Sequence, residues 1–155
     1  MINDSSSVIF SLSLIPLALA LHFLYRPLFP SMSLLVTTLG IIAMLAAAIL
    51  QTLLVFGVLE FEQEIHPVLI ANAVIGIWLI TNGMMARVGS NLPQGLAWLS
   101  VVAGIGLILI IVGFWVGGQE SLLTIVGGIL SFIGILIWAI WLGKLFLAGN
   151  VVSSA

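Results

Sequence analysis

This sequence has very little charge. Lys, Arg, Asp and Glu together make up 5% of its 155 residues, while 63% of the residues are hydrophobic. A soluble domain carries roughly 25% charged residues, and no globule of this size could bury so much apolar surface, so we expect the surrounding solvent to be lipid. With only three Lys and Arg residues and no basic run, the chain also lacks the electrostatic footprint of a nucleic-acid-binding protein. We therefore expect no nucleic-acid partner.

Cysteine is absent altogether. This absence excludes disulfides, thiolate metal sites, iron–sulfur clusters and cysteine nucleophiles. The sequence also shows no glycine-rich phosphate loop, no Ser–His–Asp arrangement and no carboxylate pair inside an apolar run, so no enzyme activity is expected. Charged residues are missing from the middle of every apolar run, where proton relays and ion pathways usually carry them. A proton-coupled transporter is therefore disfavoured.

Long apolar runs make up most of the sequence. A hydrocarbon core about 30 Å thick needs ~20 residues of helix, and backbone groups in lipid must be paired within the segment. Five runs are long enough, at residues 8–25, 32–59, 65–86, 94–117 and 121–147. The predicted fold is all-α, a single transmembrane domain of five helices over residues 1–155. The first run is short and contains Ser11, Ser13 and Pro16, so a bundle of four helices remains open if that run does not span.

The charged residues separate by side if all five runs span. One side would carry Arg26, Arg87 and Lys144, and the other Asp4, Glu60, Glu62, Glu64 and Glu120. Basic residues near helix ends mark the cytoplasmic side, whereas acids contribute little to orientation. We therefore expect a multi-pass protein of the cell membrane with its N-terminus outside and its C-terminus in the cytoplasm.

Small residues recur at helical spacing in the second to fifth runs. Such rows mark the seams where helix backbones approach closely in lipid, because association there depends on tight packing. The rows are Gly40, Ala43 and Ala47; Ala73, Gly76 and Gly83; Gly106, Gly113 and Gly117; and Gly127, Ser131 and Gly134. The sequence therefore predicts a compact bundle. Trp78, inside the third run, is expected to pack within it rather than to act chemically.

An acidic segment precedes the third run and ends at Pro67, which is expected to stand at the helix start, where its missing N–H costs nothing. The residues of this segment that could bind a metal or another cation are Glu60, Glu62, Glu64 and His66. In an extended loop these alternate residues share one side, whereas in a helix Glu62 and His66 pair at i, i+4. Carboxylates with an imidazole could bind a divalent metal or another cation. The alternative is a solvated acidic hairpin without a ligand.

Gln51 and Asn72 are the polar residues furthest inside their predicted helices. Counted at 1.5 Å per residue, Gln51 lies ~13 Å below Glu60 and Asn72 ~9 Å below His66. Neighbouring helices would bring the two amides to similar depth, so a hydrogen bond between them is expected to be feasible. It would be either an ordinary interhelical contact or the polar lining of a substrate path.

His22 and His66 are the only histidines. Either imidazole could ligate the metal of a chlorophyll-type pigment or a haem, although a histidine near an interface more often serves as a polar anchor. The predicted topology places the two near opposite membrane faces, so they are not expected to share one haem. No cofactor is required by the sequence.

Residues 66–147 resemble a family of small bacterial multi-helix membrane proteins classed only as a domain of unknown function. The strings that carry the resemblance are Gly76-Ile77-Trp78-Leu79, Leu92-Pro93, Leu96-Ala97-Trp98-Leu99, Ala103-Gly104-Ile105-Gly106 and Ile140-Trp141-Leu142-Gly143. In that family a Trp-Leu helix is followed by Leu-Pro, a glycine-bearing helix and a closing Trp-Leu helix. The resemblance implies a membrane fold and no assigned activity.

Two functions remain open. The first is a structural or accessory subunit that packs against other membrane proteins, lipid or pigment, consistent with uncharged, glycine-rich helices. The second is a small homo-oligomeric transporter or channel for an uncharged or cationic solute, for which Gln51 and Asn72 below the acidic segment are the cue. Self-association is compatible with both functions.

Overall fold

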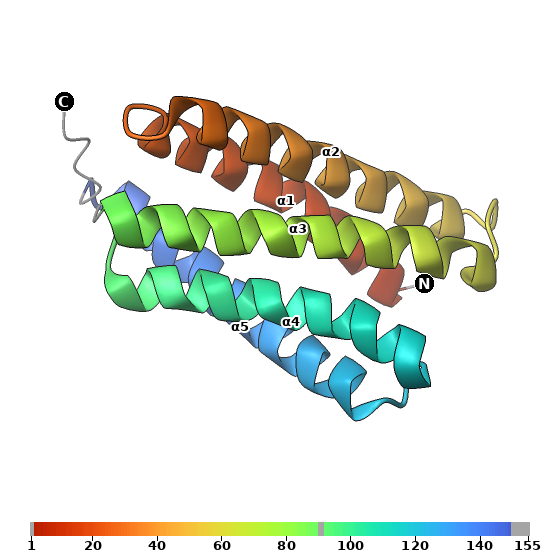
Figure 1. Cartoon of the computed structure of the whole chain (residues 1–155). Helices are drawn as coiled ribbons and strands as arrows, with labels where there is room; N and C mark the ends of the chain where they lie inside the picture. The colour runs from red at the N-terminus through yellow and green to blue at the C-terminus, as the bar shows by residue number, and fades with distance from the viewer. Residues whose placement is uncertain (1, 90–91, 150–155) are drawn as a thin grey trace.

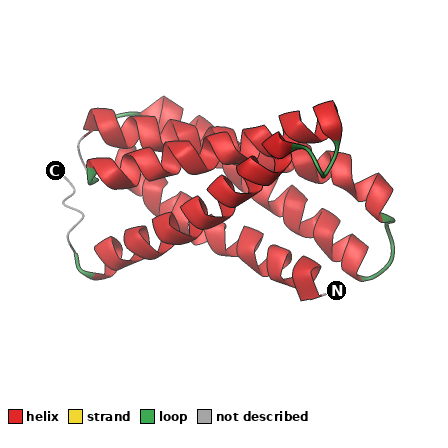
Figure 2. Cartoon of the chain, turned by 90° about the horizontal axis from the view of Figure 1, so that it is seen from below, coloured by secondary structure: helices red, strands yellow, loops and turns green. Residues whose placement is uncertain are grey.

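The computed structural model describes residues 2–89 and 92–149, with side chains from Ser6 onward. Within those ranges the chain forms five helices and no strand (Figures 1 and 2). The helices are α1 (Ile2–Tyr25), α2 (Pro30–Val55), α3 (Phe61–Gly89), α4 (Gln94–Gly117) and α5 (Leu122–Leu147). All five are long and apolar enough to cross a membrane. The predicted fold is therefore confirmed, and the first run is a full helix that continues through Pro16.

Each helix packs mainly against its neighbours in the chain, and α1 also touches α3 (Figure 1). Because successive helices run in opposite directions, α1, α3 and α5 all end on one side of the bundle. This basic end carries Arg26, Arg87 and Lys144. The opposite, acidic end holds the α2–α3 and α4–α5 connections, with Glu62 in the first turn of α3. The expected separation of charge is present for these residues, while the side chain of Asp4 lies outside the described residues.

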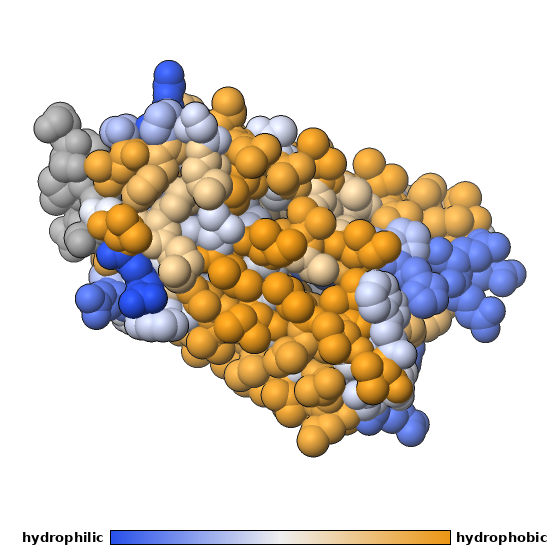
Figure 3. Space-filling model, in the orientation of Figure 1, coloured by the Kyte–Doolittle hydropathy of each residue, from blue (hydrophilic) through white to orange (hydrophobic). Residues whose placement is uncertain are grey.

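Apolar side chains cover the outside of the bundle between the two ends. Figure 3 shows hydrophobic residues over the middle of the molecule and hydrophilic ones gathered at both ends. Every helix contributes large exposed side chains to this belt. Examples, each at least 43% exposed, are Ile9, Leu34, Ile77, Ile105 and Ile133. In water such a surface would be an aggregation hazard. In lipid it is the surface expected of an integral membrane protein.

Glycines set the close approach of the helices. A Cβ built on Gly127 of α5 would lie 2.6 Å from the carbonyl oxygen of Gly106 on α4. On α2, a Cβ at Gly40 would lie 2.6 Å from Cδ1 of Trp78. Trp78 is 1% exposed and meets Trp138 edge to face, with ring centroids 5.9 Å apart. The expected seams therefore form between α2 and α3 and between α4 and α5, and Trp78 is a packing residue.

The connection between α2 and α3 differs from the expectation. α2 ends at Val55 rather than near residue 59, and α3 begins at Phe61 rather than near residue 65. The backbone N–H groups of Gln63 and Glu64 donate to the carbonyl of Glu60 at 3.0 and 3.1 Å. The side chain of Gln63 in turn accepts from the backbone N–H of Glu60 at 3.3 Å, which is one half of a capping box. The acidic segment thus starts the helix instead of preceding it.

Pro67 consequently lies inside α3, six residues after Phe61. The expectation that it starts the helix was wrong, because the helix is capped at Glu60 and begins at Phe61, about one turn before residue 65. A proline inside a helix has no N–H for the carbonyl four residues before it. In α3 that carbonyl belongs to Gln63.

Candidate functional site

The four residues considered as metal ligands are divided by the helical geometry of the first turns of α3. Glu62 and His66 lie one turn apart on an exposed face, whereas Glu64 is 4% exposed. Of the two geometries considered, the helical one is correct. In the part of the chain that the structure describes, no three histidine and carboxylate side chains are grouped so that they could hold a metal ion. The divalent-metal hypothesis therefore gains no support from the geometry.

The hydrogen bond that the sequence made feasible between Gln51 and Asn72 is not present among the described residues. The Oε1 atom of Gln51 is buried and has no hydrogen-bond partner. The reason is the earlier start of α3. Gln51 lies four residues before the end of α2 and Asn72 eleven residues after the start of α3, so their depths differ by roughly 10 Å at 1.5 Å per residue.

His22 joins α1 to the start of α2. Its Nδ1 atom lies 2.8 Å from Oγ of Ser33, and Oγ also donates to the main-chain carbonyl of His22 at 3.2 Å. Ser33 is 1% exposed. This is the interfacial polar contact that the sequence favoured over a ligand.

His66 lies at the acidic end, where its exposed ring meets Phe114 of α4 edge to face with centroids 5.8 Å apart. His22 lies in the last turn of α1, at the basic end. The two histidines are therefore at opposite ends of the bundle, as the topology predicted. Ligation of a pigment or haem by either one stays a prediction.

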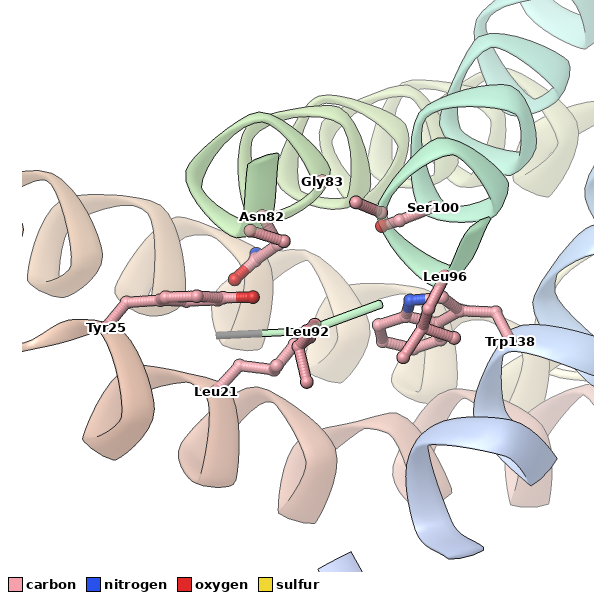
Figure 4. Close-up of a pocket in the computed structure, with 10 residues that line it drawn as sticks. Leu21, Tyr25, Asn82, Gly83, Leu92, Leu96, Ser100 and Trp138 are labelled. Atoms are coloured by element: carbon pink, nitrogen blue, oxygen red, sulfur yellow. The ribbon is translucent and has the colours of Figure 1, made fainter. Parts of the chain in front are cut away.

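A buried polar cluster at the basic end was missed by the sequence analysis. It surrounds a cavity lined by residues of four helices, among them Tyr25 of α1, Asn82 of α3, Ser100 of α4 and Trp138 of α5 (Figure 4). Tyr25, Asn82 and Ser100 are 1%, 3% and 1% exposed. The space between these residues has no room for the centre of a water molecule.

Two polar atoms of this cluster have no partner. The amide nitrogen of Asn82 donates to the carbonyl of Trp78 at 2.8 Å, and the hydroxyl of Ser100 donates to the carbonyl of Leu79 at 2.7 Å. The hydroxyl of Tyr25 and Oδ1 of Asn82 are buried without hydrogen-bond partners. Buried polar groups without partners are rare and costly. A donor and an acceptor thus line the same small space in an apolar bundle.

A signal for this cluster was present in the sequence. Tyr25 is the only tyrosine, and Asn82 is a polar residue within a strongly apolar run. What the sequence does not show is that α1 and α3 bring them together, because these helices are not neighbours in the chain. Comparisons of this chain with protein-family models, curated proteins and solved structures found no match. The resemblance of residues 66–147 to the bacterial family therefore stays a prediction.

Proposed function

We propose that this chain is a non-catalytic accessory subunit of the cell membrane, which packs laterally against other membrane proteins with its N-terminus outside and its C-terminus in the cytoplasm. The observation that carries the proposal is the tightly packed interior of a bundle whose exterior is apolar. The five spanning helices and their apolar belt are the basis on which the partner role is inferred.

The interior leaves little space for a solute. Gly40 and Gly106 bring neighbouring helices so close that a single added methyl group would collide. The cavity at Tyr25 and Asn82 does not admit water. These features support a packing role, since a small-molecule site is usually a cavity of roughly 300–1,000 Å³.

The exterior, in contrast, offers contact area to a partner. The helix connections at residues 26–29, 56–60 and 118–121 are short, so most of the described surface faces lipid or protein. Without a hydrophobic driving force in lipid, such surfaces associate through packing and interhelical contacts. A subunit held by its neighbours in the bilayer needs no large domain outside it.

The sequence feature that suggested a transporter is not reproduced in the structure. It depended on Gln51 and Asn72 lying at the same depth, and their depths differ in this structure. No other observation in the described residues favours it, and it is not proposed.

Site-specific photocross-linking in the native membrane tests the proposal. A photoreactive residue is placed at one exposed position on each helix, namely Ile9, Leu34, Ile77, Ile105 and Ile133, which are 43–70% exposed. The expected result is a cross-link to one recurring partner polypeptide from adjacent positions, which does not form when the membrane is solubilised in harsh detergent before irradiation. Cross-links to lipid alone, or only to further copies of this chain, from all five positions would refute the accessory role.

A further inference from the structure

A groove between α2 and α3 opens on the lipid-facing surface. Its volume is about 550 Å³. The small side chains of Ala43, Ala46 and Ala71 leave this space at its base. Ala43 and Ala71 are buried and Ala46 is half-buried. Ile42 and Ile70 line it with 58% and 53% of their surface exposed. The two helices run side by side in Figure 1, and the groove between them has an apolar lining.

The groove has the length of one membrane leaflet. On α2 it extends from Leu39 to Leu50, which is roughly 16 Å at 1.5 Å per residue. Half of a 30 Å hydrocarbon core is about 15 Å. At the acidic end it reaches His66 and Pro67 on α3. It therefore runs from the acidic membrane surface to about the middle of the bilayer.

Two hydrogen-bond acceptors lie close in sequence to His66 and Pro67, the lining residues at the membrane-surface end of the groove. Pro67 lines the groove and has no N–H, so the carbonyl of Gln63 lacks its usual helical donor. Glu62 lies one turn before His66 and is exposed. A carbonyl and a carboxylate at this point match a cation that has N–H groups to donate.

We propose that this groove binds one acyl chain of a phospholipid with a primary ammonium headgroup, with the ammonium at Glu62 and the carbonyl of Gln63. An acyl chain in one leaflet spans about 15 Å of hydrocarbon, which matches the length of the groove and its apolar lining. A choline headgroup has no N–H for the carbonyl, and an anionic headgroup is repelled by Glu62. This inference rests on membrane insertion and is independent of the accessory role.

Native mass spectrometry of the full chain, released from detergent micelles, tests the proposal. The protein is titrated with dioleoyl phosphatidylethanolamine, phosphatidylcholine or phosphatidylglycerol. The wild type is expected to retain one phosphatidylethanolamine with an affinity about two- to fivefold above that of the other two lipids, the range of an exposed ionic contact. Glu62→Gln removes this preference. Glu120→Gln, which changes an acid on the other connection at the same end, is the matched control and keeps it.

Filling the groove tests the acyl-chain half of the proposal. Ala46→Phe is expected to lower the retention of all three lipids, while Ile133→Phe on the exposed face of α5 leaves retention unchanged. Should Ala46→Phe fail to fold by circular dichroism and gel filtration, Ile70→Trp at the exposed side of the groove takes its place. Equal retention of the three lipids by the wild type, an undiminished preference in Glu62→Gln, or unchanged retention in a folded groove variant would each overturn the proposal.

Discussion

Gly76 of α3 and Gly104 of α4 pack backbone against backbone. A Cβ built on Gly76 would lie 2.7 Å from the carbonyl oxygen of Gly104, and a Cβ built on Gly104 would lie 2.5 Å from the carbonyl oxygen of Gly76. The contact is reciprocal, so neither residue can gain a methyl group unless the helices separate. Since helix association in lipid depends on this kind of packing, the pair fixes the distance between the two halves of the bundle.

Gly104→Ala is therefore expected to destabilise the bundle by ~1–3 kcal/mol, the usual cost of overpacking. The added methyl group would also meet Cγ1 of Ile80 at 2.8 Å. Unfolding in increasing concentrations of sodium dodecyl sulfate, followed by tryptophan fluorescence, measures the effect. Gly128→Ala on α5 is the control, because a Cβ there has no neighbour within 4 Å. Equal stability of the two variants would contradict the reciprocal contact.

Removing the unpaired hydroxyl of Tyr25 is expected not to weaken the protein. A buried polar group without a partner costs ~1–3 kcal/mol, so Tyr25→Phe should leave the free energy of unfolding unchanged or raise it. Ser100→Ala is the matched comparison, because it removes a hydroxyl that donates to Leu79 at 2.7 Å. Its expected loss is about 0.6 kcal/mol, the mean for such bonds in membranes. A loss in Tyr25→Phe as large as that in Ser100→Ala would show that the hydroxyl has a partner.

Arg87 and Trp98 form a cation–π contact across the α3–α4 connection. The guanidinium carbon lies 4.2 Å from the centroid of the Trp98 ring, and Trp98 is 48% exposed. At an exposed site such a contact contributes ~0.5–1 kcal/mol. A double-mutant cycle of Arg87→Gln and Trp98→Leu in the same unfolding assay should return a coupling energy in this range. Strictly additive effects of the two substitutions would mean that the contact contributes nothing.

The number and type of helices followed from the apolar runs, because a bilayer imposes both length and pairing of backbone groups. The α2–α3 boundary did not follow, since Glu60 and Glu62 read as a polar loop. Acids also favour the first turn of a helix, where they face the positive end of its dipole, and in this chain Glu62 and Glu64 lie in the first turn of α3. The error then carried over to the depths of Gln51 and Asn72.

The candidate site was harder to predict than the fold for a different reason. Tyr25 and Asn82 lie on helices separated by α2, and nothing in either run indicates that α1 crosses α3 at that level. The groove at Ala43 and Ala71 likewise depends on which faces of α2 and α3 meet. Both features arise from helix rotation, which an apolar sequence with weak periodicity leaves open.

The absence of cysteine makes the orientation directly testable. Single cysteines at Glu62 and Glu120 report the acidic end, and single cysteines at Leu28 and Leu147 report the basic end without altering any basic residue. Leu28 is 47% exposed and Leu147 is 91% exposed. Because basic residues mark the cytoplasmic side, a membrane-impermeant maleimide should label the acidic-end positions in intact cells and the basic-end positions only after lysis. The unmodified chain supplies the blank, as it has no thiol to label. The reverse pattern would invert the orientation and place the mouth of the α2–α3 groove in the cytoplasmic leaflet.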